Sequence, residues 1–177
     1  AYDKVVIDNP KEDLNYENCL TLNIWSPETG QAKRAVMVYI HGGGFVGGSS
    51  KEALYNGGTI AQKGDVVVVS LNYRLGLLGF LDFSTIGGSG YAGSADVGIQ
   101  DQLLALRWVK ENITAFGGDP ENITVFGESA GGGSAASLLG IDQPQNYFKR
   151  MIVMSGSPLH SAQNTSDISN LIKSETG

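Results

Sequence analysis

The sequence predicts an α/β fold, with a mostly parallel central sheet flanked by helices. The first observation is that short apolar runs alternate along the chain with segments of helical pattern, as in strand–helix–strand units. The second is that each run ends in glycine or a polar residue. Ligands bind at the carboxyl ends of strands in such sheets. The predicted strand ends are His41, Asn72, Ser129 and Ser155.

Five segments have the pattern of strands. Residues 20–25 alternate apolar and polar residues, which predicts a half-buried strand. Four continuous apolar runs predict strands buried on both faces. These runs are residues 35–40, 66–71, 123–126 and 151–154.

Three helices are predicted, at residues 59–63, 95–116 and 130–139. The helix at 95–116 has the clearest apolar face. This face is expected to contain Leu103, Leu104, Leu106, Trp108 and Val109. Residues 75–94 are rich in glycine, and we expect a loop there that is either functional or a surface excursion.

The overall composition narrows the classes of partner. A chain of 177 residues can form one domain with a sizeable core, and no boundary is visible, so we expect a single domain over residues 1–177. The net charge of -6 argues against nucleic acid or an anionic membrane surface as a partner. No apolar stretch reaches the length of a membrane span. The N-terminal residues have no signal-peptide pattern, and the missing initiator Met leaves processing or truncation open.

The candidate nucleophile is Ser129. The strand at 123–126 runs directly into Gly127-Glu128-Ser129-Ala130-Gly131, and a predicted helix follows. This is a G-x-S-x-G motif between a strand and a helix, a context that exposes the serine hydroxyl on a strained turn. The alternative is an incidental serine in a glycine-rich turn.

A second glycine motif supplies hydrogen-bond donors. Gly42-Gly43-Gly44 follows the strand at 35–40, and backbone N–H groups without Cβ atoms beside them can face one pocket. Attack by a serine creates an oxyanion that needs such donors. In hydrolases with the G-x-S-x-G motif, the residue after the nucleophile adds another N–H, which here is that of Ala130. The alternative for Gly42–Gly44 is a flexible loop.

Together these motifs resemble the type-B carboxylesterase/lipase family, which includes the cholinesterases, and most of all its bacterial members of the para-nitrobenzyl esterase kind. The resemblance covers residues 12–158 and implies an α/β-hydrolase fold, present in part. The matching stretches include Glu17-Asn18-Cys19-Leu20, His41-Gly42-Gly43-Gly44-Phe45, Asn72-Tyr73-Arg74, the run from Asp101 to Val109, the run from Asn112 to Gly132, and Ser155-Gly156-Ser157.

The resemblance also implies roles for single residues. Ser129 is the acylated nucleophile, and the N–H groups of Gly43, Gly44 and Ala130 form the oxyanion hole. Glu128 tunes the site electrostatically, unless it is simply a solvated residue of the turn. The other implied roles are a hydroxyl of Ser155 near the triad and a structural ion pair between Arg74 and Asp101. No cofactor or metal is expected, and the substrate is a small ester.

The resemblance places the triad acid and histidine far downstream of the nucleophile, in a family whose members are several hundred residues long. We therefore expect this chain to need the remainder of the same polypeptide for its acid and base. The local alternatives for the base are His41 and His160. Asp142 and Asp167 could serve as orienting acids only by residue type.

Several features stay open. Cys19 is the sole cysteine, so the default is a buried, inert thiol, although its family counterpart usually forms a disulfide. Sequons at Asn112, Asn122 and Asn164 matter only in a secreted protein, and the compartment is open between bacterial cytoplasm and secretion. A non-enzymatic binding module is the competing function. Acyl preference, including a lipase-like one, and oligomeric state are also open.

Overall fold

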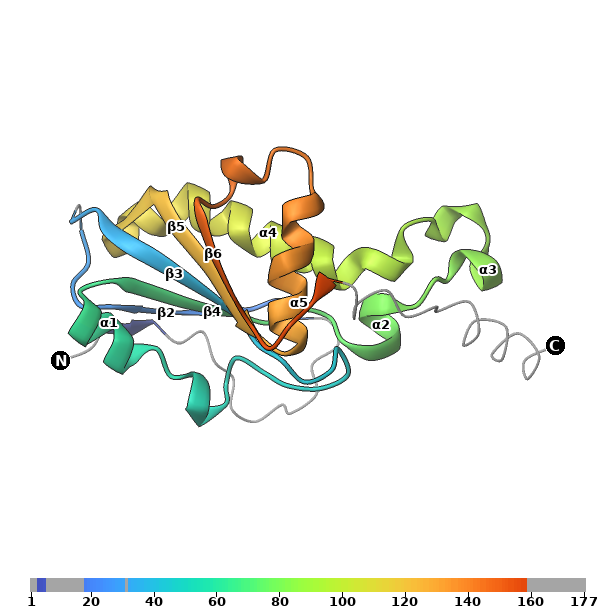
Figure 1. Cartoon of the computed structure of the whole chain (residues 1–177), viewed down its shortest axis with the longest axis horizontal. Helices are drawn as coiled ribbons and strands as arrows, with labels where there is room; N and C mark the ends of the chain where they lie inside the picture. The colour runs from blue at the N-terminus through green and yellow to red at the C-terminus, as the bar shows by residue number, and fades with distance from the viewer. Residues whose placement is uncertain (1–2, 6–17, 31, 159–177) are drawn as a thin grey trace.

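The computed structural model describes residues 3–5, 18–30 and 32–158. Its centre is a six-stranded sheet with the order β1-β2-β4-β3-β5-β6 (Figure 1). Strands β4, β3, β5 and β6 are parallel neighbours, whereas β2 runs antiparallel to β1 and β4. The predicted α/β fold with a mostly parallel sheet is confirmed. The strands are β1 (Asp3–Val5), β2 (Leu22–Ser26), β3 (Arg34–Ile40), β4 (Val67–Leu71), β5 (Gly118–Glu128) and β6 (Arg150–Met154).

Helices cover both faces of this sheet. Helix α1 lies on one face, and α4 and α5 lie on the other (Figure 1). The α-helices are α1 (Gly58–Gly64), α2 (Gly76–Phe80), α3 (Ser84–Gly87), α4 (Val97–Asn112) and α5 (Ala130–Ser137). Short 3-10 turns are η1 (Ala53–Tyr55), η2 (Ser89–Tyr91), η3 (Ser94–Asp96), η4 (Ile113–Phe116), η5 (Leu138–Gly140) and η6 (Pro144–Asn146).

The core has one part on each face of the sheet. The larger part packs α4 and α5 against the central strands, and Val67 and Val69 of β4 belong to it. The smaller part joins Val68, the residue between them, to Trp25 and to Ala61 of α1. Successive side chains of a strand point to opposite faces, so the continuous apolar run of β4 fills both parts. The structure thus confirms a strand buried on both faces here.

Strand β2 differs from the predicted half-buried strand. Ile24 and Trp25 are 4% and 6% exposed, and they belong to the two different parts of the core. Both faces of β2 are therefore covered. The polar residue Asn23 interrupts the apolar run because its side-chain amide binds Ser50 and Ser70, which an alternating pattern cannot distinguish from solvation.

The apolar face predicted for the long helix is only partly correct. Leu106 and Val109 are fully buried, but Leu104 and Trp108 are 54% and 37% exposed. The buried face of α4 instead includes Asp101. A partner elsewhere in the chain, Arg74, satisfies this carboxylate, so helical periodicity alone assigned the wrong boundary to the buried face.

The sequence predicts a loop at residues 75–94. The structure instead has the short elements α2, α3 and η2 there. These elements are too short to give a helical period in sequence, and Gly76 and Gly88 adopt positive φ angles of 58° and 85° at their boundaries. Figure 1 shows α3 far from the sheet, which agrees with a surface excursion.

Strand β6 was predicted as buried, yet it is exposed over most of its length. Ile152, Val153 and Met154 are 45%, 41% and 38% exposed. Among the described residues, β6 lies at the edge of the sheet and pairs only with β5. An apolar run predicts a strand with a preference for burial, but it does not reveal which strand stands at the edge.

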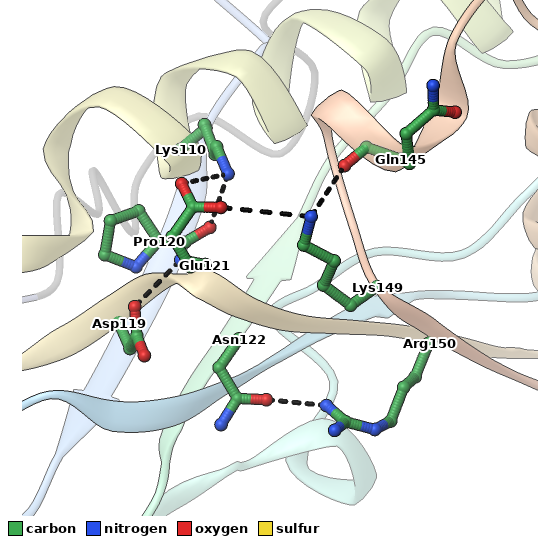
Figure 2. A network of polar contacts seen from close by, with 8 residues as sticks. All are labelled: Lys110, Asp119, Pro120, Glu121, Asn122, Gln145, Lys149 and Arg150. Carbon is green, nitrogen blue, oxygen red and sulfur yellow. Dashed lines mark hydrogen bonds and ion pairs between the residues drawn. The ribbon is translucent and has the colours of Figure 1, made fainter.

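Polar contacts join the amino ends of β5 and β6 to the end of α4 (Figure 2). The ammonium of Lys110 lies 2.7 Å from a carboxylate oxygen of Glu121, and that of Lys149 lies 3.9 Å from the other oxygen. Arg150 donates a hydrogen bond to the side-chain oxygen of Asn122, over 2.6 Å. These contacts lie at the end of β5 opposite Ser129. Exposed pairs of this kind contribute little to stability, so they mainly fix local geometry.

No helix within the described part of the chain is long and apolar enough to cross a membrane.

Candidate active site

The four predicted strand ends lie at one edge of the sheet. His41, Asn72, Ser129 and Ser155 follow β3, β4, β5 and β6 directly. These four strands are parallel neighbours, so their carboxyl ends meet at the same edge. The register pairs Ile40 of β3 with Gly127 of β5, which brings the two glycine motifs side by side.

Ser129 stands on a strained turn. Its φ and ψ angles are 55° and -122°, a conformation that L-residues rarely adopt. The turn is possible only with glycines around it, because a Cβ at Gly127 would collide with the carbonyl of Gly131. A Cβ at Gly131 would in turn collide with the carbonyl of Ile40. This geometry is the one that the G-x-S-x-G motif requires, and it leaves Ser129 half-buried at the end of β5.

The turn is tied to β6 through the backbone. The N–H of Ser129 donates to the carbonyl oxygen of Met154 over 2.9 Å. Ser155, the next residue, is exposed and has a φ of 52°. The predicted second hydroxyl of the site therefore follows the residue that anchors the nucleophile turn, on a backbone that is itself strained.

The predicted oxyanion residues form a tight turn. The N–H groups of Val46 and Gly47 both donate to the carbonyl oxygen of Gly43, over 3.1 Å each. Gly43 and Gly44 have φ angles of 110° and 63°, and both are exposed. Within the described residues, no acceptor is found for the N–H groups of Gly43 and Gly44. These two donors are thus available to a ligand.

The turn lies against the nucleophile. A Cβ built on Gly42 would stand 3.2 Å from the Cβ of Ser129 and 2.8 Å from the carbonyl oxygen of Glu128. The third predicted donor is the N–H of Ala130, the first residue of α5, and N–H groups in a first helical turn have no acceptor within the helix. The turn that carries Gly43 and Gly44 therefore packs against the candidate nucleophile through Gly42.

His41 supports the donor turn rather than the nucleophile. Its ring is 1% exposed, and its Nδ1 lies 2.8 Å from the carbonyl oxygen of Gly42. The peptide between Gly42 and Gly43 is trans, so its N–H points away from its C=O. A carbonyl of Gly42 directed toward His41 therefore directs the N–H of Gly43 to the opposite side.

The ionisation of His41 fits this supporting position. Burial lowers the pKa of His41 below its usual 6.5. The ring stacks on Tyr73 with 4.6 Å between ring centroids, and Nε2 has no hydrogen-bond partner among the described residues. A neutral ring held in this way makes no contact with Ser129, so the structure gives no support to His41 as the base.

Glu128 is exposed at the end of β5, beside the donor turn. A Cβ on Gly42 would stand 3.2 Å from its Oε2. Its charge reaches Tyr39, whose pKa is raised first by burial, then by Tyr55, and also by Glu128. A negative charge therefore lies next to the candidate nucleophile, as the electrostatic role predicted for Glu128 requires.

Arg74 and Asp101 form a bidentate ion pair. The Nε and Nη2 atoms of Arg74 donate to the two carboxylate oxygens of Asp101, over 2.8 and 2.7 Å. The Asp101 side chain is 3% exposed and that of Arg74 is 40% exposed. The hydrogen bond to Asp101 is the main reason why the pKa of Arg74 is raised. The pair joins the segment after β4 to α4 and does not contact Ser129.

Of the acid and base candidates other than His41, Asp142 alone lies among the described residues. Asp142 is exposed in the segment between α5 and β6. His160 and Asp167 lie outside the described residues, as does the sequon at Asn164. In the described part of the chain, no three His, Cys, Asp or Glu side chains are placed to hold a metal ion. Cys19 is half-buried rather than buried, and it is a free thiol.

An apolar groove of about 370 Å³ lies elsewhere, between α4 and β2. Leu22, Leu104 and Trp108 are among the apolar residues that line it, and Asp101 is among the polar ones. The nucleophile and the oxyanion donors do not line it. The groove is therefore separate from the candidate active site.

Two contacts near the site escaped the sequence analysis. The hydroxyl of Tyr73 donates to the carbonyl oxygen of His41 over 2.9 Å. Gln102 of α4 donates to Ser134 of α5 over 3.0 Å, and both side chains are fully buried. Tyr73 belongs to the matching stretch Asn72-Tyr73-Arg74, so the motif marked its position but not its partner.

Comparisons with known proteins agree with this geometry. A model of the carboxylesterase family matches residues 2–175. Para-nitrobenzyl esterase of Bacillus subtilis is 50% identical over 141 residues, which are 80% of this chain and 28% of that protein. Acetylcholinesterase of Gallus gallus is 45% identical over 154 residues, 85% of this chain and 19% of that protein.

Solved structures show the same similarity. The carboxylesterase of Geobacillus stearothermophilus at pH 6.2 superposes with a TM-score of 0.79 at 48% identity, over 87% of this chain and 32% of that one. An esterase from Clostridium hathewayi gives a TM-score of 0.75 at 45% identity, over 86% of this chain and 32% of that one. The chain thus spans less than a third of the length of each of these four relatives.

Proposed function

The chain belongs to the carboxylesterase family, and we propose that it is the nucleophile-bearing part of a serine esterase that cleaves carboxylic esters through an acyl-enzyme at Ser129. The resemblance predicted from the sequence and the α/β-hydrolase fold are both confirmed. In this proposal, residues 1–177 are part of a single domain that the rest of the same polypeptide completes.

One observation carries the proposal: the donor turn lies directly against the strained nucleophile turn. A Cβ on Gly42 would stand 3.2 Å from the Cβ of Ser129 and 2.8 Å from the carbonyl oxygen of Glu128, so the absence of that atom lets the turns meet. A carbonyl carbon attacked by Ser129 would have its oxygen near the N–H groups of Gly43, Gly44 and Ala130. Preorganised donors of this kind stabilise the charge that develops in the transition state.

The reaction proceeds in two steps. The Oγ of Ser129 forms a bond to the ester carbonyl carbon, a base takes the hydroxyl proton, and the carbonyl oxygen becomes an oxyanion in the donor turn. The bond to the alcohol oxygen then breaks, and the alcohol leaves with the proton. Water releases the acid from Ser129 by the same route in the second step.

The base and its orienting acid are proposed to come from a part of the polypeptide beyond this chain. The ring of His41 is buried and turned toward Gly42, and Asp142 is exposed away from the turn. Glu128 and Ser155 are proposed to act around the incoming histidine, since both lie at the carboxyl edge beside Ser129. The pair of Arg74 and Asp101 is proposed to be structural.

The proposed substrates are small carboxylic esters, without a nucleic-acid partner. The exposed glycines of the donor turn leave room for bulky alcohol groups, because Gly43 and Gly44 place no side chain in the site.

The test is hydrolysis of para-nitrophenyl acetate by the full-length protein and by a protein that ends at Gly177. We expect the full-length form to turn over and its Ser129→Ala variant to be inactive. The shorter form should be at least about a thousandfold slower, the order of loss when a triad member is absent. Rapid turnover by the shorter form that disappears in His160→Ala would refute the downstream base.

A further inference from the structure

We propose that Asn72 and Tyr73 are positioning residues that hold the two ends of the donor loop, residues 41–50, and thereby set the oxyanion hole. The inference rests on the proposed function. Its basis is a set of hydrogen bonds by which two successive residues at the end of β4 grip the loop that follows β3.

Tyr73 holds the first end of the loop. Its hydroxyl donates to the carbonyl oxygen of His41 over 2.9 Å, and its ring stacks on the His41 ring. Tyr73 is 4% exposed, and burial raises the pKa of its hydroxyl, which therefore remains a neutral donor. His41 in turn faces the carbonyl of Gly42, so the contact of Tyr73 is one residue from the peptide that orients the N–H of Gly43.

Asn72 holds the second end of the loop. Its side-chain oxygen accepts a hydrogen bond from the N–H of Ser50 over 2.9 Å. Its side-chain nitrogen donates to the hydroxyl of Thr21 over 2.9 Å, and its backbone N–H donates to the carbonyl of Thr21 over 2.8 Å. The amide of Asn72 is thus fixed on one side by Thr21, the residue before β2, and holds the loop on the other.

Asn23 reinforces this second grip. Its side-chain nitrogen lies 3.1 Å from the hydroxyl of Ser50 and 3.2 Å from that of Ser70. Ser50 is 3% exposed, so its polar atoms depend on these partners rather than on water. The loop is consequently clamped to β2 and β4 at a buried point.

The middle of the loop needs such clamps. Gly42, Gly43, Gly44, Gly47 and Gly48 leave it with little conformational restraint of its own. A donor displaced by about 1 Å can cost about a hundredfold in rate. Fixed ends at His41 and Ser50 turn a flexible glycine run into a preorganised donor site, as electrostatic catalysis requires.

The first test uses three substitutions in the full-length protein. Asn72→Leu removes the side-chain grip on Ser50 at similar volume, and Tyr73→Phe removes one hydroxyl while keeping the ring. Asn122→Leu is the matched control, because it removes an asparagine side chain that binds Arg150 at the opposite end of β5 and does not touch the loop. We expect kcat for para-nitrophenyl acetate to fall by about 10- to 100-fold in the first two, with KM changed by less than about threefold. The control should stay within about twofold of wild type.

Affinity for a trifluoromethyl ketone, which forms an oxyanion on the serine, should fall in parallel with kcat/KM in Asn72→Leu and Tyr73→Phe. A residue with a merely structural role would lower thermal stability without this parallel. Equal loss of kcat in Asn122→Leu and Asn72→Leu, or unchanged kcat in both loop variants, would overturn the proposal.

A second readout does not depend on turnover. The N–H groups of Val46 and Gly47 are bound to Gly43 and report the closure of the turn. Their hydrogen exchange should be at least about tenfold faster in Asn72→Leu and Tyr73→Phe than in wild type, and unchanged in Asn122→Leu. Unchanged exchange in the loop variants would contradict the clamp. An inactive wild type with the expected exchange pattern would refute the esterase function and leave the clamp standing.

Discussion

The backbone N–H of Ser129 donates to the carbonyl oxygen of Met154, with 2.9 Å between the two atoms. This hydrogen bond fixes the nucleophile turn to β6 and uses the N–H of the serine itself. The donors left for an oxyanion are therefore the N–H of Ala130 and those of the glycine turn. The same bond helps to hold Ser129 at a φ of 55°, where a side chain is strained.

The strain at Ser129 predicts a gain in stability on substitution by glycine. Glycine adopts this conformation without steric cost, although it loses more conformational freedom on folding. We expect Ser129→Gly to unfold with a free energy about 1 kcal/mol higher than Ser129→Ala, as the balance of these two effects. Urea unfolding of both variants measures this difference in free energy. A Ser129→Gly variant less stable than Ser129→Ala would argue against strain at Ser129.

The contact between α5 and β3 predicts that Gly131 tolerates no side chain. A Cβ there would collide with the carbonyl of Ile40 and would stand 2.7 Å from that of His41. We expect Gly131→Ala to lose about 1–3 kcal/mol of stability and most of the esterase activity. Gly140→Ala is the matched control, because a Cβ at Gly140 meets no atom within 4 Å. Equal thermal unfolding of the two variants would contradict this packing.

The buried carboxylate of Asp101 predicts a large cost when its partner is removed. Arg74→Met leaves a charge that is 3% exposed without its counter-ion. We expect Arg74→Met to lower the free energy of unfolding by about 3 kcal/mol. This value is at the lower end of the range for broken buried ion pairs, because Arg74 itself is partly exposed. Chemical denaturation should also show that R74M/D101L is more stable than R74M. A single variant as stable as wild type would show that the pair contributes nothing.

The buried ring of His41 predicts a stability that falls in acid. Burial lowers its folded-state pKa below 6.5, so below this pH the unfolded chain binds a proton that the folded chain resists. The stabilising contribution is complete above 6.5 and is lost as the pH falls toward the lowered pKa. We expect His41→Gln to have a shallower decline in unfolding free energy between about pH 7 and about pH 5. If the unfolding free energy falls equally steeply with pH in wild type and in His41→Gln, His41 is not the source of the acid sensitivity.

Much of this architecture could be predicted from the sequence because it depends on local patterns. The β-branched run of β4 is buried on both faces, and glycines stand where the turns of Ser129 and Gly43 need them. Periodicity failed where a distant residue decides burial. Asp101 is buried because Arg74 reaches it, and Asn23 can precede the buried Ile24 because Ser50 and Ser70 bind its amide.

The supporting contacts of the candidate site were the least predictable part. Tyr73 and His41 are 32 residues apart in sequence. Asn72 and Ser50 are separated by 22 positions. No local pattern encodes such pairs, because they arise only when β3 and β4 pair in register. The motif residues indicated where the candidate site lies. Which side chains support it depends on the pairing of the strands in the sheet.

We propose that Ser129 is a nucleophile set in a preformed oxyanion hole. The most direct measurement is covalent labelling of the full-length protein with a fluorophosphonate probe, followed by mass spectrometry of the modified peptide. The account predicts one adduct, on Ser129, and none in Ser129→Ala. An unlabelled wild-type protein, or an adduct that persists on another residue in Ser129→Ala, would contradict it.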